Sequence, residues 1–220
     1  MKTLYKILML ALALVAAGAC QKSDATKDYG FAKVYIPQAG VTGLDNSYPI
    51  PMGPFYQNRD YCCKYDPATG KLQIVVGVIR SGYFSQQQAY SVSLGLCKSE
   101  TERKLSEYAA KEIPATELTP DLCTIPATIE VKQGQSGETC YVDVDMKALA
   151  LQRTALVSGG RYKLLVLGLE ISHLNGPVNY ELANKNTSVV VVLDLNSQHW
   201  DTVPSDKPES EVRNLFPLIL

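Results

Sequence analysis

The sequence predicts an antiparallel β-sandwich with short helical turns, and three observations lead to this fold class. Apolar and polar residues alternate in several segments, as they do in strands that bury one face. Such segments recur about every 10 to 20 residues and are separated by stretches rich in Gly, Pro, Asn and Asp. Only two short windows have helical character, which favours packed sheets over an alternating α/β architecture.

The first expected strand is FAKVYI at residues 31–36, in which Phe31, Val34 and Ile36 are candidates for burial. Residues 37–70 follow and contain five prolines. Proline cannot donate a ladder hydrogen bond, so this stretch indicates loops or short edge strands.

The next two strands are more regular. In KLQIVVGVI, which begins at residue 71, one face carries the apolar side chains of Leu72, Ile74, Val76 and Val78. In YSVSLGLC, which begins at residue 90, one face carries Val92, Leu94 and Leu96. Both patterns predict strands with one face in the core.

Residues 128–132 and 140–146 flank a turn-rich segment, QGQSG, and we expect them to form a hairpin. In the second of these strands the apolar face carries Val142 and Val144, and the opposite face carries Tyr141, Asp143 and Asp145. YKLLVLGLEIS at 162–172 and TSVVVVLDL at 187–195 are the most apolar segments, so we expect them to be central. The helical windows are 100–111 and 146–153.

Residues 1–19 have the composition of a secretory signal peptide. Two lysines lie in the first six residues, and an uncharged run then ends in the small residues that precede Cys20. As a helix this run of 13 residues covers roughly 20 Å, short of the ~30 Å hydrocarbon core of a bilayer. We therefore expect a signal that is removed and not a helix that stays in the membrane.

The residues AGAC at 17–20 are typical of a lipoprotein signal, in which the cysteine thiol is alkylated by a diacylglycerol and the leader is cleaved before it. Ala17 stands where Leu is commonest. We predict a signal peptide at 1–19, lipid attachment at Cys20 and a flexible tether at 20–30. An ordinary secreted protein with Cys20 near its new N-terminus is the alternative.

Charge and cysteine spacing exclude some classes of function. Removal of Lys2 and Lys6 with the leader leaves 19 basic and 22 acidic residues, with no basic block, so nucleic acid is not an expected partner. The spacing of the later cysteines does not match a zinc site. We expect them to be buried thiols, and one disulfide among them is an open alternative. The five are Cys62, Cys63, Cys97, Cys123 and Cys140. If residues 62 and 63 lie in a strand, they point to opposite faces and at most one of the two faces the core.

The order of these elements resembles a family: the domain of unknown function at the N-terminus of surface lipoproteins from Gram-negative polysaccharide-utilisation systems. The same domain precedes some family 18 endoglycosidase domains. The matching segments are AKVYIPQAG, KLQIVVGVIRSG, YSVSLGL, IPATIEVKQGQSGETCYVDVDM, GGRYKLLVLGLEIS and NKNTSVVVVLDL. This resemblance covers 31–195 and implies an immunoglobulin-like sandwich in an outer-membrane lipoprotein. It also implies glycan capture, or the spacing of a second domain from the membrane. The remaining tail, 196–220, is too short for a domain.

The sequence contains little that indicates catalysis. It has two histidines, His173 and His199, and no G-x-S-x-G, HExxH or P-loop motif. We interpret His173 as a solvated residue at a strand end. Asp143 and Asp145 share a strand face and form a poor calcium site without converging loop oxygens, so we interpret them as part of a solvated face.

Glycan binding requires an exposed aromatic ring beside polar groups, because the CH-rich face of a sugar packs on the ring while amides and acids bind its hydroxyls. Tyr56 and Tyr61 lie in a segment of this composition, and Tyr83 has Gln86 and Gln87 nearby. Trp200, the single tryptophan, lies between His199 and Asp201 and is the strongest ligand-binding candidate. The alternative is that these rings pack at sheet edges.

The sequence thus predicts an outer-membrane-anchored surface lipoprotein that binds or helps capture glycans, without catalysis and without a cofactor or metal. Its expected partners are the membrane, a polysaccharide or oligosaccharide, and an outer-membrane transporter complex. The alternative function is that of a structural or adhesive surface protein that acts through protein–protein contacts, for which exposed edge strands are suited. The exterior face of the membrane is the expected location, with the periplasmic face as the alternative.

Overall fold

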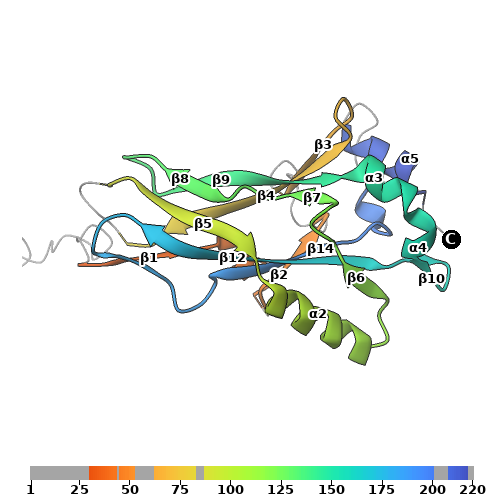
Figure 1. The fold of residues 1–220 in the computed structure, drawn as a ribbon, viewed down its shortest axis with the longest axis horizontal. Helices are drawn as coiled ribbons and strands as arrows, with labels where there is room; N and C mark the ends of the chain where they lie inside the picture. The colour runs from red at the N-terminus through yellow and green to blue at the C-terminus, as the bar shows by residue number, and fades with distance from the viewer. Residues whose placement is uncertain (1–29, 44, 53–61, 83–86, 201–207, 218–220) are drawn as a thin grey trace, which may run out of the picture.

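The computed structural model describes residues 30–43, 45–52, 62–82, 87–200 and 208–217, which form two β-sheets packed face to face (Figure 1). The predicted immunoglobulin-like β-sandwich is therefore confirmed. The predicted signal peptide, Cys20 and most of the predicted tether lie outside the described residues, as do Tyr56, Tyr61 and Tyr83. Within the described part of the chain, no helix is long and apolar enough to cross a membrane.

The first sheet has the strand order β13-β1-β4-β9-β7, with β3 also paired to β4. Its longest pair is β4 and β9, which run antiparallel over nine residue pairs from Lys71↔Asp145 to Ile79↔Gly137. The strands are β1 (Ala32–Tyr35), β3 (Cys63–Asp66), β4 (Lys71–Arg80), β7 (Cys123–Thr124), β9 (Gly137–Asp145) and β13 (Tyr180–Leu182).

The second sheet has the order β2-β14-β12-β5-β8, with β6 also paired to β12. The two most apolar segments of the sequence form β12 and β14, which pair with each other inside this sheet, as predicted. The strands are β2 (Ser47–Ile50), β5 (Tyr90–Leu96), β6 (Ala115–Glu117), β8 (Thr128–Val131), β12 (Leu164–Asn175) and β14 (Ser188–Leu193).

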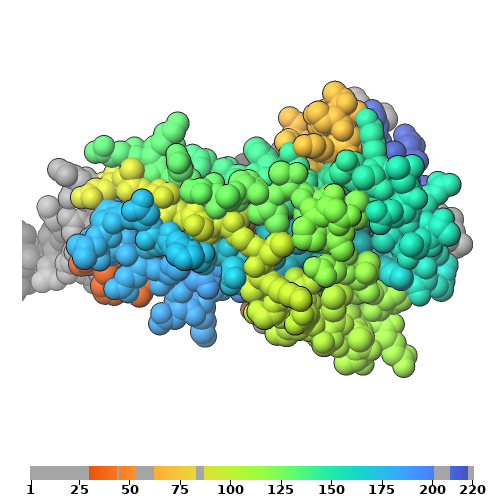
Figure 2. Space-filling model, in the orientation of Figure 1, coloured from red at the N-terminus to blue at the C-terminus, as the bar shows by residue number. Residues whose placement is uncertain are grey.

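Helix α2 (Lys98–Ala110) covers part of the outer face of the second sheet and stands out as a ridge in Figure 2. Its Leu105 and Tyr108 pack on Val166, Val190 and Val192 of β12 and β14. The short elements are η2 (Pro37–Gly40), α3 (Met146–Leu151), α4 (Arg153–Leu156), the hairpin β10 (Val157–Ser158) and β11 (Arg161–Tyr162), η4 (Gln198–Trp200), η5 (Pro208–Glu211) and α5 (Val212–Leu215). Both predicted helical windows are thus helical.

The core lies between the sheets and follows the predicted alternation along β4 and β9, where each predicted apolar side chain is buried. Two expectations were wrong. Phe31 is 57% exposed, because it precedes β1, whose inward positions are Ala32 and Val34. Leu96 is 43% exposed, because it ends β5 next to the residue that caps α2.

The predicted hairpin of residues 128–146 is also wrong. β8 pairs with β5, and β9 pairs with β4, so the two strands belong to different sheets and the turn at 133–137 connects the layers. The alternating pattern in each strand is real, but it reports a buried face and not a hydrogen-bonded neighbour.

Three strand pairs are parallel in a fold that the sequence predicted to be antiparallel: β1 with β13, β2 with β14, and β6 with β12. Each joins a short strand to a partner that is distant in sequence. The remaining pairs of both sheets are antiparallel.

Cys97, Cys123 and Cys140 carry free thiols. The expectation that at most one of Cys62 and Cys63 faces the core was conditional on both residues lying in a strand. Both are buried, and their Sγ atoms lie 3.7 Å apart. Strand alternation does not apply to this pair, because Cys62 precedes the first residue of β3.

Candidate functional site

Trp200 does not present its ring to solvent. It is 2% exposed in η4, and its indole N–H donates a hydrogen bond of 3.0 Å to the backbone oxygen of Asp194. A ring in this position packs in the core and is closed to a sugar. The predicted role of Trp200 as a ligand-binding residue is therefore wrong, and the alternative interpretation, that the ring packs, holds for it.

An exposed aromatic ring lies elsewhere, on the outer face of β4 and β9. Tyr141 is 48% exposed, because its neighbours along β9, Cys140 and Val142, point toward the core. Its cross-strand partner on β4 is Val75, which is half-buried. The sequence placed Tyr141 on the outward face of its strand but did not mark it as a binding residue.

Polar side chains follow Tyr141 along the same outward face. Asp143 lies two positions further along β9 and opposite Gln73 of β4. The Gln73 amide donates to Asp143 Oδ1 at 3.3 Å, and Lys71 Nζ lies 3.5 Å from Asp143 Oδ2. An amide, a carboxylate and an ammonium group are therefore gathered beside one exposed ring.

On the other side of Tyr141 the surface is hollowed. Gly77 and Thr139 are the next cross-strand pair, and they line a hollow of about 280 Å³ together with Pro37. Gly77 has no side chain to fill it, and a Cβ there would lie only 2.7 Å from the backbone oxygen of Glu138. We call the outward positions of this strand pair the β4–β9 outer face; they are Lys71, Gln73, Val75, Gly77, Thr139, Tyr141 and Asp143.

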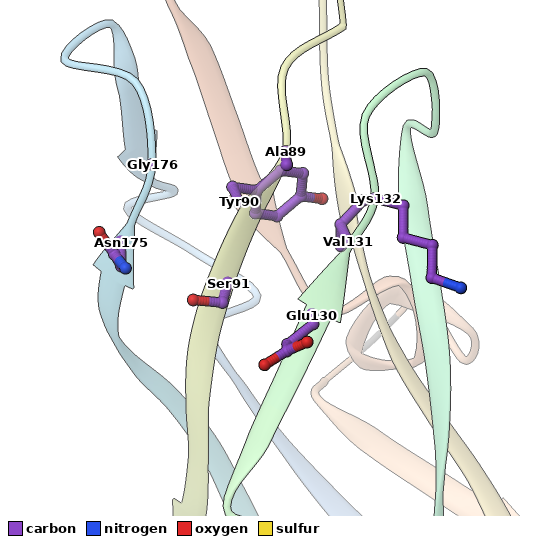
Figure 3. Close-up of a pocket in the computed structure, with 8 residues that line it drawn as sticks. All are labelled: Ala89, Tyr90, Ser91, Glu130, Val131, Lys132, Asn175 and Gly176. Atoms are coloured by element: carbon purple, nitrogen blue, oxygen red, sulfur yellow. The ribbon is translucent and has the colours of Figure 1, made fainter.

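A second hollow, of about 350 Å³, lies on the outer face of β12, β5 and β8 (Figure 3). Asn175, Ser91 and Glu130 form a row across these three strands, since Ser91 is registered with both of the others. The aromatic residue here is Tyr90, which is buried and contacts Tyr180 edge-to-face with ring centroids 5.6 Å apart. Burial raises the pKa of Tyr90 to about 12. This hollow has hydrogen-bonding groups but no exposed ring.

A third hollow, of about 530 Å³, lies at the end of the sandwich where the β10–β11 hairpin turns. Asn196 lines it, but both ends of its side-chain amide are bonded to the backbone of Tyr162, at 2.7 and 2.8 Å. Asp194 in turn accepts a hydrogen bond from the backbone N–H of Asn196 at 2.9 Å. These polar groups hold the local fold, so the hollow offers few free partners to a ligand.

The residues considered for chemistry have other roles. His173 is exposed inside β12 and has a φ of 46°, with its Nδ1 2.9 Å from the Ser172 hydroxyl. Asp145 caps α3 by accepting a hydrogen bond from the N–H of Ala148. Asp143 and Asp145 therefore serve separate structural contacts.

Burial raises the pKa of the Cys140 thiol to about 11, which keeps it protonated at neutral pH. Among the described residues no group of three or more His, Cys, Asp or Glu could hold a metal ion.

No family model and no curated protein matches the chain. Among solved structures it is similar to a proposed carbohydrate-binding protein from Bacteroides ovatus, at 10% identity over 74% of this chain and 36% of that one, with a TM-score of 0.41. It is also similar to a multidomain protein including DUF1735 from Bacteroides ovatus, at 17% identity over 74% of this chain and 43% of that one, with a TM-score of 0.42. The chain spans less than half the length of these two proteins.

A third solved structure with similarity is the Calx CBD1 domain, at 11% identity over 74% of this chain and 98% of that one, with a TM-score of 0.38. At these identities and scores the ligand and the role of this chain have to be inferred from its own residues. Membership of the lipoprotein family that the sequence resembles stays a prediction.

Proposed function

We propose that this protein is a surface lipoprotein of the outer membrane that binds a glycan, without catalysis, on the β4–β9 outer face. The observation that carries the proposal is the exposed ring of Tyr141 beside the hydrogen-bonded pair of Gln73 and Asp143. Among the described residues we identify no other exposed aromatic ring beside such a polar group on a regular sheet.

The chemistry of a sugar fits this arrangement in two ways. The CH-rich face of a pyranose ring is apolar and packs on the face of Tyr141, which removes apolar surface from water. The equatorial hydroxyls are donors and acceptors, and Asp143 accepts while the amide of Gln73 both donates and accepts. Asp143 is already held by Gln73 and Lys71, so little side-chain freedom is lost when a ligand binds.

The shape of the face favours an extended ligand over a compact one. Three consecutive cross-strand pairs, spaced about 7 Å apart along the strands, provide the Gly77–Thr139 hollow, the Tyr141 ring and the Gln73–Asp143 pair. An oligosaccharide laid along β9 meets all three in turn. A monosaccharide meets one of them.

The lipid anchor at Cys20 is the second part of the proposal and is supported by the sequence alone. Two or three acyl chains on one cysteine make release from the membrane negligible, because each buried CH₂ contributes about 0.8 kcal/mol. Cys20→Ser is expected to abolish labelling by radioactive palmitate in a Gram-negative host. Labelling that persists in this variant would refute the anchor and leave the glycan site untouched.

Affinity electrophoresis of the protein in polysaccharide gels tests the glycan site. Tyr141→Ala and Asp143→Ala are each expected to weaken retardation by about tenfold or more, since a well-packed aromatic contact or a charged hydrogen bond is worth roughly 1–3 kcal/mol. Phe31→Ala is the matched control, because it removes an exposed ring that precedes β1 and lies outside the β4–β9 outer face.

Equal retardation of the parent chain and of Tyr141→Ala would contradict the site. The absence of retardation across a broad panel of glycans, together with stable self-association in solution, would favour the alternative of a structural or adhesive protein. A transporter partner is tested separately, by co-purification from detergent-solubilised outer membranes.

A further inference from the structure

One end of the sandwich has an unusual composition. It is the end where β1 begins, and the described parts of the connections 81–89, 132–136 and 176–179 lie there (Figure 1). These three connections carry a single charged residue, Lys132, and no acid. At the opposite end the connection 146–163 alone carries four basic residues, and α2 nearby is rich in both signs of charge.

Two apolar side chains are exposed at the weakly charged end. Val178 is 100% exposed and Phe31 is 57% exposed. They are held near each other because β1 and β13 pair in parallel and the N–H of Ala32 donates to the oxygen of Asn179 at 2.9 Å. The Lys33 ammonium lies 5.7 Å from the centre of the Phe31 ring. Lys33 also pairs with Glu181, so the charge beside the two apolar side chains is balanced. Two exposed apolar side chains at an end with few other charges are typical of a surface that meets lipid.

The order of the chain indicates the same partner. Cys20, the proposed acylated residue, precedes Phe31 by 11 residues, and an extended chain of that length spans at most about 40 Å. Because Phe31 leads directly into β1, the anchored chain enters the fold at this end.

We propose that this end, which we call the tip and define by Phe31, Val178 and residues 132–136, lies against the lipid surface, with Phe31 and Val178 at the boundary between headgroups and acyl chains. The proposal rests on the anchor at Cys20 and adds an orientation to it. β9 then leads away from the membrane, and Tyr141 lies about 13 Å along the strand from its first residue. The β4–β9 outer face consequently stays open to the medium while the tip contacts lipid.

Fluorescence quenching in reconstituted vesicles tests the orientation. The full chain is expressed with its own leader, recovered from the membrane fraction and reconstituted into phosphatidylethanolamine–phosphatidylglycerol vesicles that contain dibrominated acyl chains. Val178→Trp places a probe at the tip. Leu151→Trp is the matched control, since Leu151 is also apolar, is 89% exposed and lies in α3 at the opposite end. The parent chain, whose Trp200 is buried, gives the background.

The added fluorescence of Val178→Trp is expected to be quenched by at least half relative to vesicles without bromine, and that of Leu151→Trp by less than a tenth. Equal quenching at the two positions, or none at either, would overturn the proposal, and so would recovery of the chain entirely in the soluble fraction. Retardation in polysaccharide gels is measured without vesicles. Failure of the glycan site is therefore distinguished from failure of the orientation.

Discussion

Trp200 stabilises the fold at the scale of a single residue, through both burial and the hydrogen bond from its indole N–H to Asp194. Trp200→Ala leaves a cavity and an unpaired carbonyl oxygen, and we expect it to lower the free energy of unfolding by about 3–5 kcal/mol. Urea denaturation followed by circular dichroism measures the loss. Trp200→Phe keeps most of the volume and is expected to lose less. A Trp200→Ala protein as stable as the parent would contradict the assigned core position.

The carboxyl group of Asp45 makes the free energy of unfolding depend on pH in the acid range. Burial raises the pKa of its carboxyl, but hydrogen bonds from the Lys104 ammonium at 2.7 Å and from Ser47 outweigh burial and hold the pKa well below its usual range. A depressed folded-state pKa contributes stability above the unfolded-state pKa of about 4, and this contribution is lost as the pH falls through the folded-state value. Stability should therefore decline between about pH 5 and pH 2.

Asp45→Asn is expected to be less stable than the parent at pH 7 and to lose less stability on acidification. Urea denaturation at pH 7, 4 and 2.5 gives the dependence of the free energy of unfolding on pH for each protein. Asp121→Asn removes an exposed carboxylate before β7 and should retain the slope of the parent. Parallel pH profiles for the parent and Asp45→Asn would show that another group determines the acid sensitivity.

At the scale of elements, Gly168 fixes how α2 sits on β12. Its N–H donates to the Thr101 hydroxyl at 2.8 Å, and its oxygen accepts from the N–H of Cys97 at 2.9 Å. A Cβ at Gly168 would lie 2.3 Å from the oxygen of Cys97, so Gly168→Ala must push the start of the helix away. We expect a loss of roughly 1–3 kcal/mol in the free energy of unfolding.

Gly95 provides the control for this substitution. It also lies inside a strand of the second sheet, but a Cβ there meets nothing within 4 Å. Gly95→Ala is expected to leave stability unchanged or to raise it slightly, because alanine restricts the unfolded chain. Chemical denaturation measures the free energy of unfolding of both variants. Equal losses in Gly168→Ala and Gly95→Ala would argue against close packing as the cause at Gly168.

The elements themselves could be predicted from sequence more readily than their partners. Alternation identified β4 and β9, because it depends only on which side of a strand is buried, and continuous apolar content identified β12 and β14. It could not identify the sheet to which a strand belongs, which is why β8 and β9 were expected to pair. The parallel pairs of β1, β2 and β6 depend on partners distant in sequence, and local pattern carries no signal for them.

The candidate site was predictable in part for the same reason. The outward position of Tyr141 and Asp143 followed from alternation within β9. Their contact with Gln73 and Lys71 required the register of β4 against β9, which the sequence did not provide. Trp200 was misjudged because polar neighbours in sequence do not determine burial, and a 3-10 turn brings its ring back to the core.

At the scale of the whole molecule, the C-terminal tail is part of the core, although the sequence placed the end of the sandwich at residue 195. Trp200, Val212 and Phe216 are all buried, and the Phe216 ring meets Tyr162 edge-to-face with centroids 5.6 Å apart. Full burial of such side chains contributes roughly 1.5–3 kcal/mol each, and the three together are comparable to the 5–15 kcal/mol stability of a typical domain.

A chain ended after residue 195 is therefore expected to lose cooperative thermal unfolding, whereas a chain ended after residue 217 keeps every buried side chain of the described tail and should melt like the parent. Thermal melts followed by near-ultraviolet circular dichroism distinguish the two, since this signal reports packed aromatic rings. A sharp transition in the shorter chain, within a few degrees of the parent, would show that the two sheets close their core without the tail. In that case the boundary predicted at residue 195 would be correct, and the buried tail would be an addition to a fold that is already complete.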